Sequence, residues 1–301
     1  MSAALQSTAP QPWQLADGAT AAFLPNGALH LDHGPIHLVI SAEGSRVAVE
    51  AAYGKACRAF EGLLGALAQD LRRLRSPLDT KDQNAWSSRT AERMAAAVAP
   101  FEDSFVTPMA AVAGSVADEI AEAIWPTPGL TRAYVNNGGD IALRLAEGQS
   151  FTLGVVENLA HGQPTAKLTV SRHDGIQGIA TSGWSGHSFS LGIADAVTVL
   201  APSAASADAA ATLIANTVDC DHAAIRRRPA RDIDPESDLG LRPVTIEVLP
   251  LPLAAVDAAL DAGAHSATEM LAQGLIVGAL LCLQGETRSL GSIAFREMSA
   301  P

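Results

Sequence analysis

The sequence predicts a folded α+β protein, and three observations support this class. Hydrophobic residues make up 48% and charged residues 17% of the 301-residue chain, which is typical of a folded protein and unlike a disordered one. Segments that alternate apolar and polar residues, as strands do, are mixed with segments of helical periodicity. No internal repeat or clear domain break interrupts them. We therefore expect a flexible N-terminal arm over residues 1–13 and a single domain over residues 14–301.

The charge and the termini of the chain exclude several classes of function. The formal net charge of −12 argues against binding to nucleic acid or to an anionic membrane, since both require clustered Lys and Arg. The three cysteines are odd in number and lack metal-ligand spacing, which predicts reduced thiols. Neither a signal peptide nor an apolar run of about 18 residues is visible. The sequence thus predicts a cytoplasmic protein without a membrane span.

The N-terminal third predicts strands followed by helices. Residues 22–40 alternate around Asp-His-Gly-Pro at 32–35, which indicates two antiparallel strands and a tight turn. Apolar residues at helical spacing then predict one long helix over residues 45–74 and a shorter one over residues 90–98.

A further helix is predicted over residues 105–125, beginning near Thr107 and Pro108. Ala110, Ala113 and Gly114 leave one of its faces almost without side chains. Such a face lets a helix lie close to a sheet or to a ligand, and packing against a sheet is the more common use.

The rest of the chain predicts a sheet and its covering helices. Residues 132–172 indicate a meander of four strands, and residues 196–201 a buried strand that precedes an alanine-rich helix carrying Asp208. Residues 219–243 form the longest polar stretch and indicate an excursion or lid. The remaining predicted elements are a strand over 244–249, a helix over 254–273, a pair of strands around 275–284 and a short strand near 292–296.

The first segment with chemical potential is Asn-Asn-Gly-Gly-Asp at residues 136–140. Gly138 and Gly139 allow the backbone to approach a ligand closely, and Asp140 could accept a hydrogen bond from a ribose hydroxyl or an amide. The alternative is a tight hairpin turn, for which Asn-Gly is the most frequent signal. Taken alone, the pattern favours the turn.

The second segment runs from Thr181 to Asp195. Thr181, Ser182 and Gly183 could donate hydroxyl and amide hydrogens to a ligand, or they could form a loop with local hydrogen bonds. His187 lies between Gly186 and Ser188, and its imidazole suits acid–base catalysis near neutral pH. Asp195 could hold the protonated imidazole. We predict His187 and Asp195 as catalytic residues, with a purely structural histidine as the alternative.

The third segment is the helix that contains Asp208 and Thr212. Residues four apart lie on one helix face, and a carboxylate beside a hydroxyl, facing the carboxylate of Asp195, forms a predicted site for a hard cation such as Mg²⁺. The alternative is that Asp208 only caps the helix and interacts with its dipole. Without further information the cap is favoured.

Five motifs, in chain order, resemble the FAD:protein FMN transferase (ApbE) family, and most of all its uncharacterised ApbE-like branch. They are TPMAAVAG at 107–114, VNNGGDI at 135–141, IATSG at 179–183, ADAVTV at 194–199 and SADAAAT at 206–212. The resemblance implies an ApbE-type α+β fold related to the T-fold, with mixed or antiparallel sheets and packed helices. It also implies a pocket for FAD or a related dinucleotide and a magnesium ion. By position it implies Asp208 and Thr212 as metal ligands, and Asn137, Gly138, Gly139, Asp140, Thr181, Ser182 and Gly183 as cofactor-binding residues.

The chain departs from the transferases at two motifs. A His-x-x-Asp-Pro-x-Thr-Gly run is replaced by His-Ser-Phe-Ser-Leu-Gly at 187–192, and the Ala-Lys-Gly that precedes a helix is replaced by Ala-Val-Ala-Gly at 111–114. Three functions therefore stay open: Mg²⁺-dependent FMN transfer from FAD to a protein Thr or Ser, ligand binding without transfer, and a different small-molecule reaction using His187 and Asp195. The expected partners are a small-molecule ligand, an acceptor protein and a second copy of the chain. In each case residues 135–141, 178–187 and 206–212 should meet at one cleft.

Overall fold

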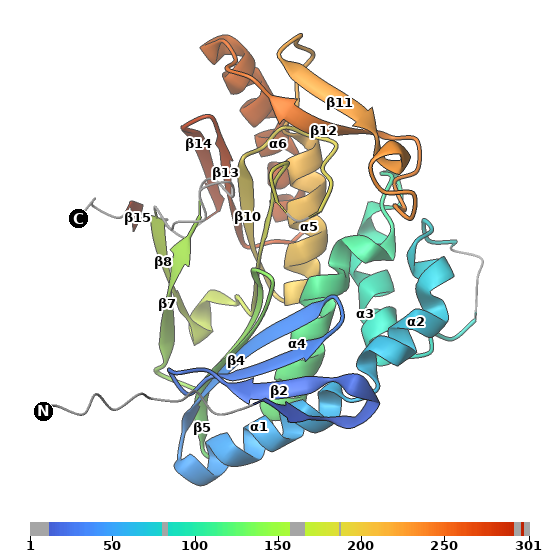
Figure 1. Cartoon of the computed structure of the whole chain (residues 1–301). Helices are drawn as coiled ribbons and strands as arrows, with labels where there is room; N and C mark the ends of the chain where they lie inside the picture. The colour runs from blue at the N-terminus through green and yellow to red at the C-terminus, as the bar shows by residue number, and fades with distance from the viewer. Residues whose placement is uncertain (1–11, 80–83, 157–165, 187, 292–295, 298–301) are drawn as a thin grey trace, which may run out of the picture.

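A computed structural model describes residues 12–79, 84–156, 166–186, 188–291 and 296–297. It confirms the α+β class: the described residues form a ten-stranded sheet, two smaller sheets and six α-helices (Figure 1). The large sheet has the order β1-β2-β3-β4-β5-β6-β9-β10-β13-β14, and its neighbouring strands are antiparallel. Its strands are β1 (Trp13–Gln14), β2 (Thr20–Phe23), β3 (Leu29–His33), β4 (Ile36–Gly44), β5 (Leu130–Asn137), β6 (Asp140–Leu145), β9 (Gly178–Ser182), β10 (Ala196–Ala201), β13 (Gly278–Leu283) and β14 (Glu286–Gly291).

The α-helices cover one face of this sheet. Two groups of buried side chains lie between helices and sheet, one formed with β3, β4 and β5 and the other with β10 and β13. The opposite face is covered in part by β7 (Ser150–Val155), β8 (Ala166–Ser171) and β15 (Arg296–Glu297), which form the three-stranded sheet. The helices are α1 (Arg46–Phe60), α2 (Leu63–Leu74), α3 (Arg89–Val98), α4 (Val112–Ile124), α5 (Ala204–Thr217) and α6 (Leu253–Ala272).

The predicted N-terminal hairpin is confirmed as β3 and β4, but the single helix over 45–74 is wrong. Two helices, α1 and α2, occupy that range, and Gly62 lies between them with a φ of +77°. Glycine adopts this left-handed conformation readily, so it ends one helix and allows the next to start in a new direction. The apolar spacing continues across the break, which is why periodicity alone did not reveal it.

The meander predicted over residues 132–172 is also wrong in its connections. All four strands exist as β5, β6, β7 and β8, but only the first two belong to the large sheet. There β6 pairs with β9, whereas β7 and β8 pair with each other in the smaller sheet. The alternation of apolar and polar residues predicts that a strand has one buried face, but it does not show which sheet the strand joins.

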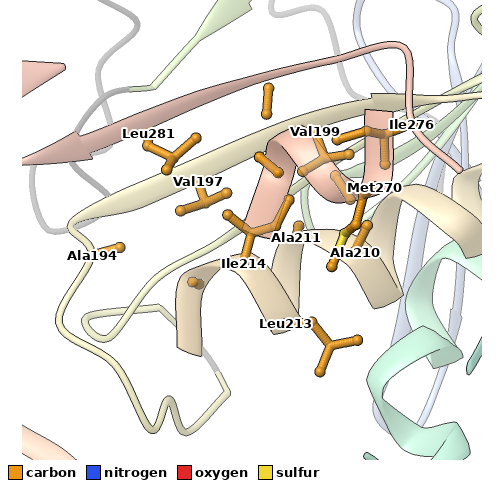
Figure 2. Packing of buried hydrophobic residues seen from close by; sticks show 14 of the residues in the cluster. Ala194, Val197, Val199, Ala210, Ala211, Leu213, Ile214, Met270, Ile276 and Leu281 are labelled. Carbon is orange, nitrogen blue, oxygen red and sulfur yellow. The ribbon is translucent and has the colours of Figure 1, made fainter. Parts of the chain in front are cut away.

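The centre of the fold is formed by β10 and α5. Every residue of β10 is buried, and α5 packs on it through small side chains and Ile214 (Figure 2). Ser203 is the N-cap of α5, because its side chain accepts a hydrogen bond from the amide of Ser206. Asp208 lies one turn further along the helix. The alternative in which Asp208 is merely the helix cap is therefore wrong, and its carboxylate is available for another contact.

The polar stretch over 219–243 contains more order than a loop. Strand β11 (Ile225–Pro229) pairs with β12 (Pro243–Val248), and the connection between them folds against the N-terminal side of α4 (Figure 1). Helix α6 follows near its predicted position. The pair of strands predicted around 275–284 is wrong in its bounds, because that range holds only β13, and its hairpin partner β14 follows at Glu286–Gly291. The expected arm lies mostly outside the described residues, except that β1 begins at Trp13. No helix in the described part of the chain is long and apolar enough to cross a membrane.

Candidate functional site

A cavity of about 380 Å³ lies where the beginnings of β6 and α4 meet one side of α5. Volumes of this order are typical of small-molecule sites. The loop that follows β9 and the loop between β11 and β12 complete its wall. The lining residues used below are Asp140, Asp208, Thr212, Asn216, Ala113, Arg75, Asp234, Glu236 and Asp238.

Asp208 is held at the N-terminal end of α4. Its Oδ2 accepts a hydrogen bond of 2.9 Å from the backbone amide of Gly114. This contact depends on a close crossing of α4 and α5, because a Cβ atom on Gly114 would lie 2.2 Å from the carbonyl oxygen of Ala204. Gly114, on the small face predicted for residues 105–125, thus packs against a helix, and Ala113 on the same face contacts Asn137 of β5. One consequence is that α4 directs a backbone amide into the cavity.

Asp140 reaches the cavity from the first position of β6. The hairpin turn before it contains Gly138 and Gly139 at φ values of +66° and +114°, and the amide of Gly139 donates to Asn136 Oδ1 at 2.8 Å. The Asn-Gly segment is therefore a tight turn, as the alternative predicts, and the turn places Asp140 on the helix-covered face of the sheet. The backbone amide of Thr181, on β9, donates to the Asp140 carboxyl.

Asn137 links this turn to the other wall of the cavity. Its side chain is buried, and Nδ2 donates to the carbonyl oxygen of Ala113 at 3.1 Å. Because Ala113 precedes the amide that binds Asp208, the Asn137 side chain fixes the two carboxylate-bearing segments relative to each other. In the structure the Asn137 side-chain amide therefore donates to a backbone carbonyl of the cavity wall.

The two carboxyl groups have unusual electrostatics. Burial raises the pKa of Asp140 from its ordinary 3.8 to about 7. Burial also raises the pKa of Asp208 well above its ordinary value, and the nearby charge of Asp140 raises it further. The amides of Gly114 and Ala113 oppose this shift without cancelling it. Two carboxylates that share a cavity in this way favour a bound proton or a bound cation.

No Lys or Arg of the described residues forms an ion pair with Asp140 or Asp208. Arg75 lines the cavity, but its guanidinium lies 3.3 Å from Glu236, which is itself a cavity residue. Asp234 and Asp238 add further acidic groups to the same wall. An anionic ligand would therefore enter a field of like charge unless a cation accompanied it.

The donor set fits magnesium. Asp208 and Thr212 lie four residues apart on one face of α5, and Asp140 is close enough to raise the pKa of Asp208 by its charge. These groups offer two carboxylates and a hydroxyl, and Mg²⁺ prefers a few protein oxygens completed by water and phosphate. Asp140, predicted as a cofactor-binding residue, thus joins the two predicted metal ligands in one cavity.

The remaining predicted residues lie elsewhere or outside the described residues. Among the described residues, Thr181, Ser182 and Gly183 do not line the cavity, although the Thr181 amide contacts Asp140. The Thr181 hydroxyl lies 2.9 Å from that of Thr198 on β10. His187 falls outside the described residues, while Ser188 and Phe189 just after it line the cavity.

Asp195 is not a lining residue of the cavity. Its Oδ1 accepts a hydrogen bond from the Trp184 indole at 3.3 Å, and its Oδ2 accepts one from the backbone amide of Gln284 at 2.6 Å. These contacts join the loop after β9 to the β13–β14 turn. The described geometry therefore gives Asp195 a role in positioning that loop, and Asp195 is not brought together with Asp208.

Sequence reasoning missed Asn216, which follows Thr212 by four residues. Its Oδ1 accepts from the Leu191 amide at 2.9 Å and from Ser190 Oγ at 3.3 Å, so it holds the loop that carries Phe189. The signal was available: Asp208, Thr212 and Asn216 form a polar stripe at positions i, i+4 and i+8 of a helix whose other residues are mostly apolar.

The contribution of the β11–β12 connection was also missed. Thr107 Oγ1 donates a hydrogen bond to Asp238, and the guanidinium of Arg242 stacks 3.1 Å from the ring centroid of Phe105. Both contacts hold this connection over the cavity. The sequence predicted an excursion or lid here, but no local pattern shows that Thr107, more than a hundred residues earlier, is its partner.

A family model described as AbpE bacteria matches residues 21–289. A UPF0280 protein of Methanopyrus kandleri is 41% identical over 140 residues, which are 46% of this chain and 53% of that protein. A UPF0280 protein of Methanocaldococcus jannaschii is 39% identical over 112 residues, which are 37% and 44% of the two chains. The matched part of the chain thus spans about half the length of these relatives.

Two solved structures are similar over most of their length. The apo form of the Pseudomonas stutzeri flavinyl transferase ApbE has 14% sequence identity and a TM-score of 0.44, and the match covers 95% of this chain and 96% of that one. The ApbE protein of Thermotoga maritima has 13% identity and a TM-score of 0.44, covering 93% and 97%.

Proposed function

The chain belongs to the family described as AbpE bacteria, and on this premise we propose that its cavity binds FAD or a related dinucleotide together with Mg²⁺. The observation that carries the proposal is the carboxylate pair, Asp140 and Asp208. Both carboxyl groups have raised pKa values, and no described cationic side chain pairs with either. A divalent cation would offset their repulsion and also the repulsion between the acidic cavity and a pyrophosphate.

Different residues of the cavity would bind the cation, hold its ligands in place and limit the access of water. Asp208 and Thr212 on α5, with Asp140 on β6, would supply oxygen ligands to the cation. The Gly114 amide fixes the Asp208 carboxylate at 2.9 Å, and Asn137 fixes the segment that carries this amide. The β11–β12 connection would limit access of water, because Thr107 and Phe105 hold it against the cavity. When bound, Mg²⁺ supplies positive charge that neutralises charge on a pyrophosphate.

Within this proposal the reaction is FMN transfer. The hydroxyl oxygen of an acceptor Thr or Ser would bond to the FMN phosphorus of FAD, and the P–O bond to the AMP half would break. AMP would leave with the bonding electrons, and the hydroxyl proton would pass to a base, for which His187 is the candidate. Ala113 at the cavity wall argues for a second function: binding without transfer, since the related transferases carry a lysine in the corresponding motif.

Calorimetry of purified, metal-free protein tests the binding proposal. We expect FAD to bind in the presence of Mg²⁺ and to bind at least about tenfold more weakly without it. Asp208→Ala should remove the effect of Mg²⁺, whereas Asp221→Asn, a change of an exposed acidic residue that does not line the cavity, should keep it. Equal Mg²⁺ affinity in wild type and Asp208→Ala would refute the metal site.

A second assay separates the two functions. Wild-type protein incubated with FAD, Mg²⁺ and Ser- or Thr-containing protein substrates should release AMP if it transfers FMN. Mg²⁺-dependent FAD binding with no AMP would identify the non-transferring function.

A further inference from the structure

A second group of possible metal ligands lies on the opposite face of the large sheet, on β3 and β4. Leu29 and Leu31 of β3 and Leu38 of β4 are buried on the helix-covered face. Since side chains alternate along a strand, His30, Asp32 and His37 lie together on the other face. The register supports this arrangement, because Asp32 and His37 are directly opposite each other.

The three side chains are close enough to share one ion. Each residue offers one ligand atom, and these three atoms lie within 4.8 Å of one another. They are a ring nitrogen of His30, a ring nitrogen of His37 and a carboxylate oxygen of Asp32. His37 Nδ1 is hydrogen-bonded to Asp32 Oδ2. Ligand atoms of a zinc ion are bound at about 2.0–2.1 Å and so lie roughly 3–3.5 Å apart. Small side-chain rotations would therefore bring the three atoms to binding distance, with the paired strands keeping their backbones fixed.

The donor set selects the kind of metal. Two imidazoles with one carboxylate suit Zn²⁺ and chemically similar ions such as Co²⁺ and Ni²⁺, whereas Mg²⁺ prefers oxygen ligands alone. We propose that His30, Asp32 and His37 form a binding site for Zn²⁺ or a similar divalent transition metal, separate from the cavity. Three protein ligands leave one position of a tetrahedral ion for water or another ligand.

The surroundings of the group suit such a site. His30 and Asp32 are half-buried and His37 is exposed, so an ion can enter from solvent while two of its ligands are held by packing. The same chain offers matched controls in His265, beside Glu269, and His173, beside Glu147. Each control pair consists of one exposed histidine and one carboxylate, whereas the proposed site has two histidines and one carboxylate.

The test is metal binding to the full chain after removal of metals with EDTA. Titration with Co²⁺ followed by absorption, and with Zn²⁺ by calorimetry, should show a site that is lost in the double variant His30→Gln/His37→Gln. Loss of a residue that only supports a metal ligand usually weakens metal binding about 10- to 100-fold. Because His30 and His37 are proposed as direct ligands, each single variant should weaken Zn²⁺ binding by at least about 10-fold. His265→Ala should bind like wild type.

Two further measurements keep the outcome unambiguous. Zn²⁺ should raise the unfolding midpoint of wild type and not that of the double variant, whose midpoint without metal should match wild type. Asp208→Ala should retain the Zn²⁺ site, which distinguishes it from the proposed Mg²⁺ site in the cavity. Equal Zn²⁺ stoichiometry and affinity in wild type and double variant would overturn the proposal.

Discussion

The carboxylate pair makes the stability of the metal-free protein depend on pH. Asp140 has a pKa of about 7 in the folded state against an ordinary 3.8, so the folded state holds this proton more tightly than the unfolded state. For a carboxyl with a raised pKa, the free energy of unfolding falls as pH rises from about 4 through 7. Between pH 5.5 and pH 8 the linkage relation gives a loss of roughly 2 kcal/mol from Asp140 alone. The half-buried position of Asp140 leaves it partly screened by solvent, which reduces this loss toward about 1 kcal/mol.

The variant Asp140→Asn tests this reasoning. It keeps the shape of the side chain and removes the ionisation, and it also removes one cause of the raised pKa of Asp208. Urea unfolding in EDTA at pH 5.5 and pH 8 should show a smaller decrease for the variant, by about 1–2 kcal/mol, than for wild type. The exposed Asp221→Asn is the control and should decrease like wild type. At pH 8, Mg²⁺ should stabilise wild type and not Asp140→Asn. An identical pH dependence in wild type and Asp140→Asn would refute the assignment of the shift to Asp140.

Two further changes probe the helix crossing and the loop after β9. Gly114→Ala would place a Cβ 2.2 Å from the Ala204 carbonyl oxygen and should lower the free energy of unfolding by about 3 kcal/mol. The control Gly65→Ala, in an exposed helical position with open space, should raise the free energy of unfolding by about 0.5–1 kcal/mol. Urea unfolding of both variants measures these changes, and equal effects would contradict the close crossing of α4 and α5. If His187 is the base in FMN transfer, His187→Ala should lower the rate of AMP release by roughly 100-fold with little change in FAD affinity, and unchanged rate and affinity would end its catalytic assignment.

Residues close in sequence were predicted well, and contacts between distant segments were not. Strand β10 and helix α3 lie at or within one residue of their predicted positions, because alternation and helical spacing are local properties. The break at Gly62 was missed, since an isolated glycine within an apolar periodic segment is compatible with a continuous helix. The placement of β7 and β8 in a separate sheet depends on packing that no local pattern encodes.

The candidate site shows the same division. Asp208 and Thr212 could be paired from the sequence, because i and i+4 positions share a helix face. Their proximity to Asp140 followed from a resemblance of motifs and not from spacing, since 68 positions separate Asp140 from Asp208 and the sheet order brings them together. The position of Asp195 just before β10 suggested a catalytic residue. In the structure its carboxylate accepts hydrogen bonds from the Trp184 indole and from the backbone amide of Gln284, and its catalytic role stays a prediction.

The arrangement around Gly114 connects the stability of the fold to the chemistry proposed for the cavity. A larger residue at this position would separate α4 from α5, because its Cβ would contact the Ala204 backbone. The separation would remove the amide from Asp208 and displace Ala113, which is the acceptor for Asn137. Both carboxylate-bearing segments would then lose their common support. The alanine-rich composition of α5 therefore has a second consequence besides tight packing on β10: it lets one helix end contact Asp208, the central acidic residue of the cavity, without an intervening side chain.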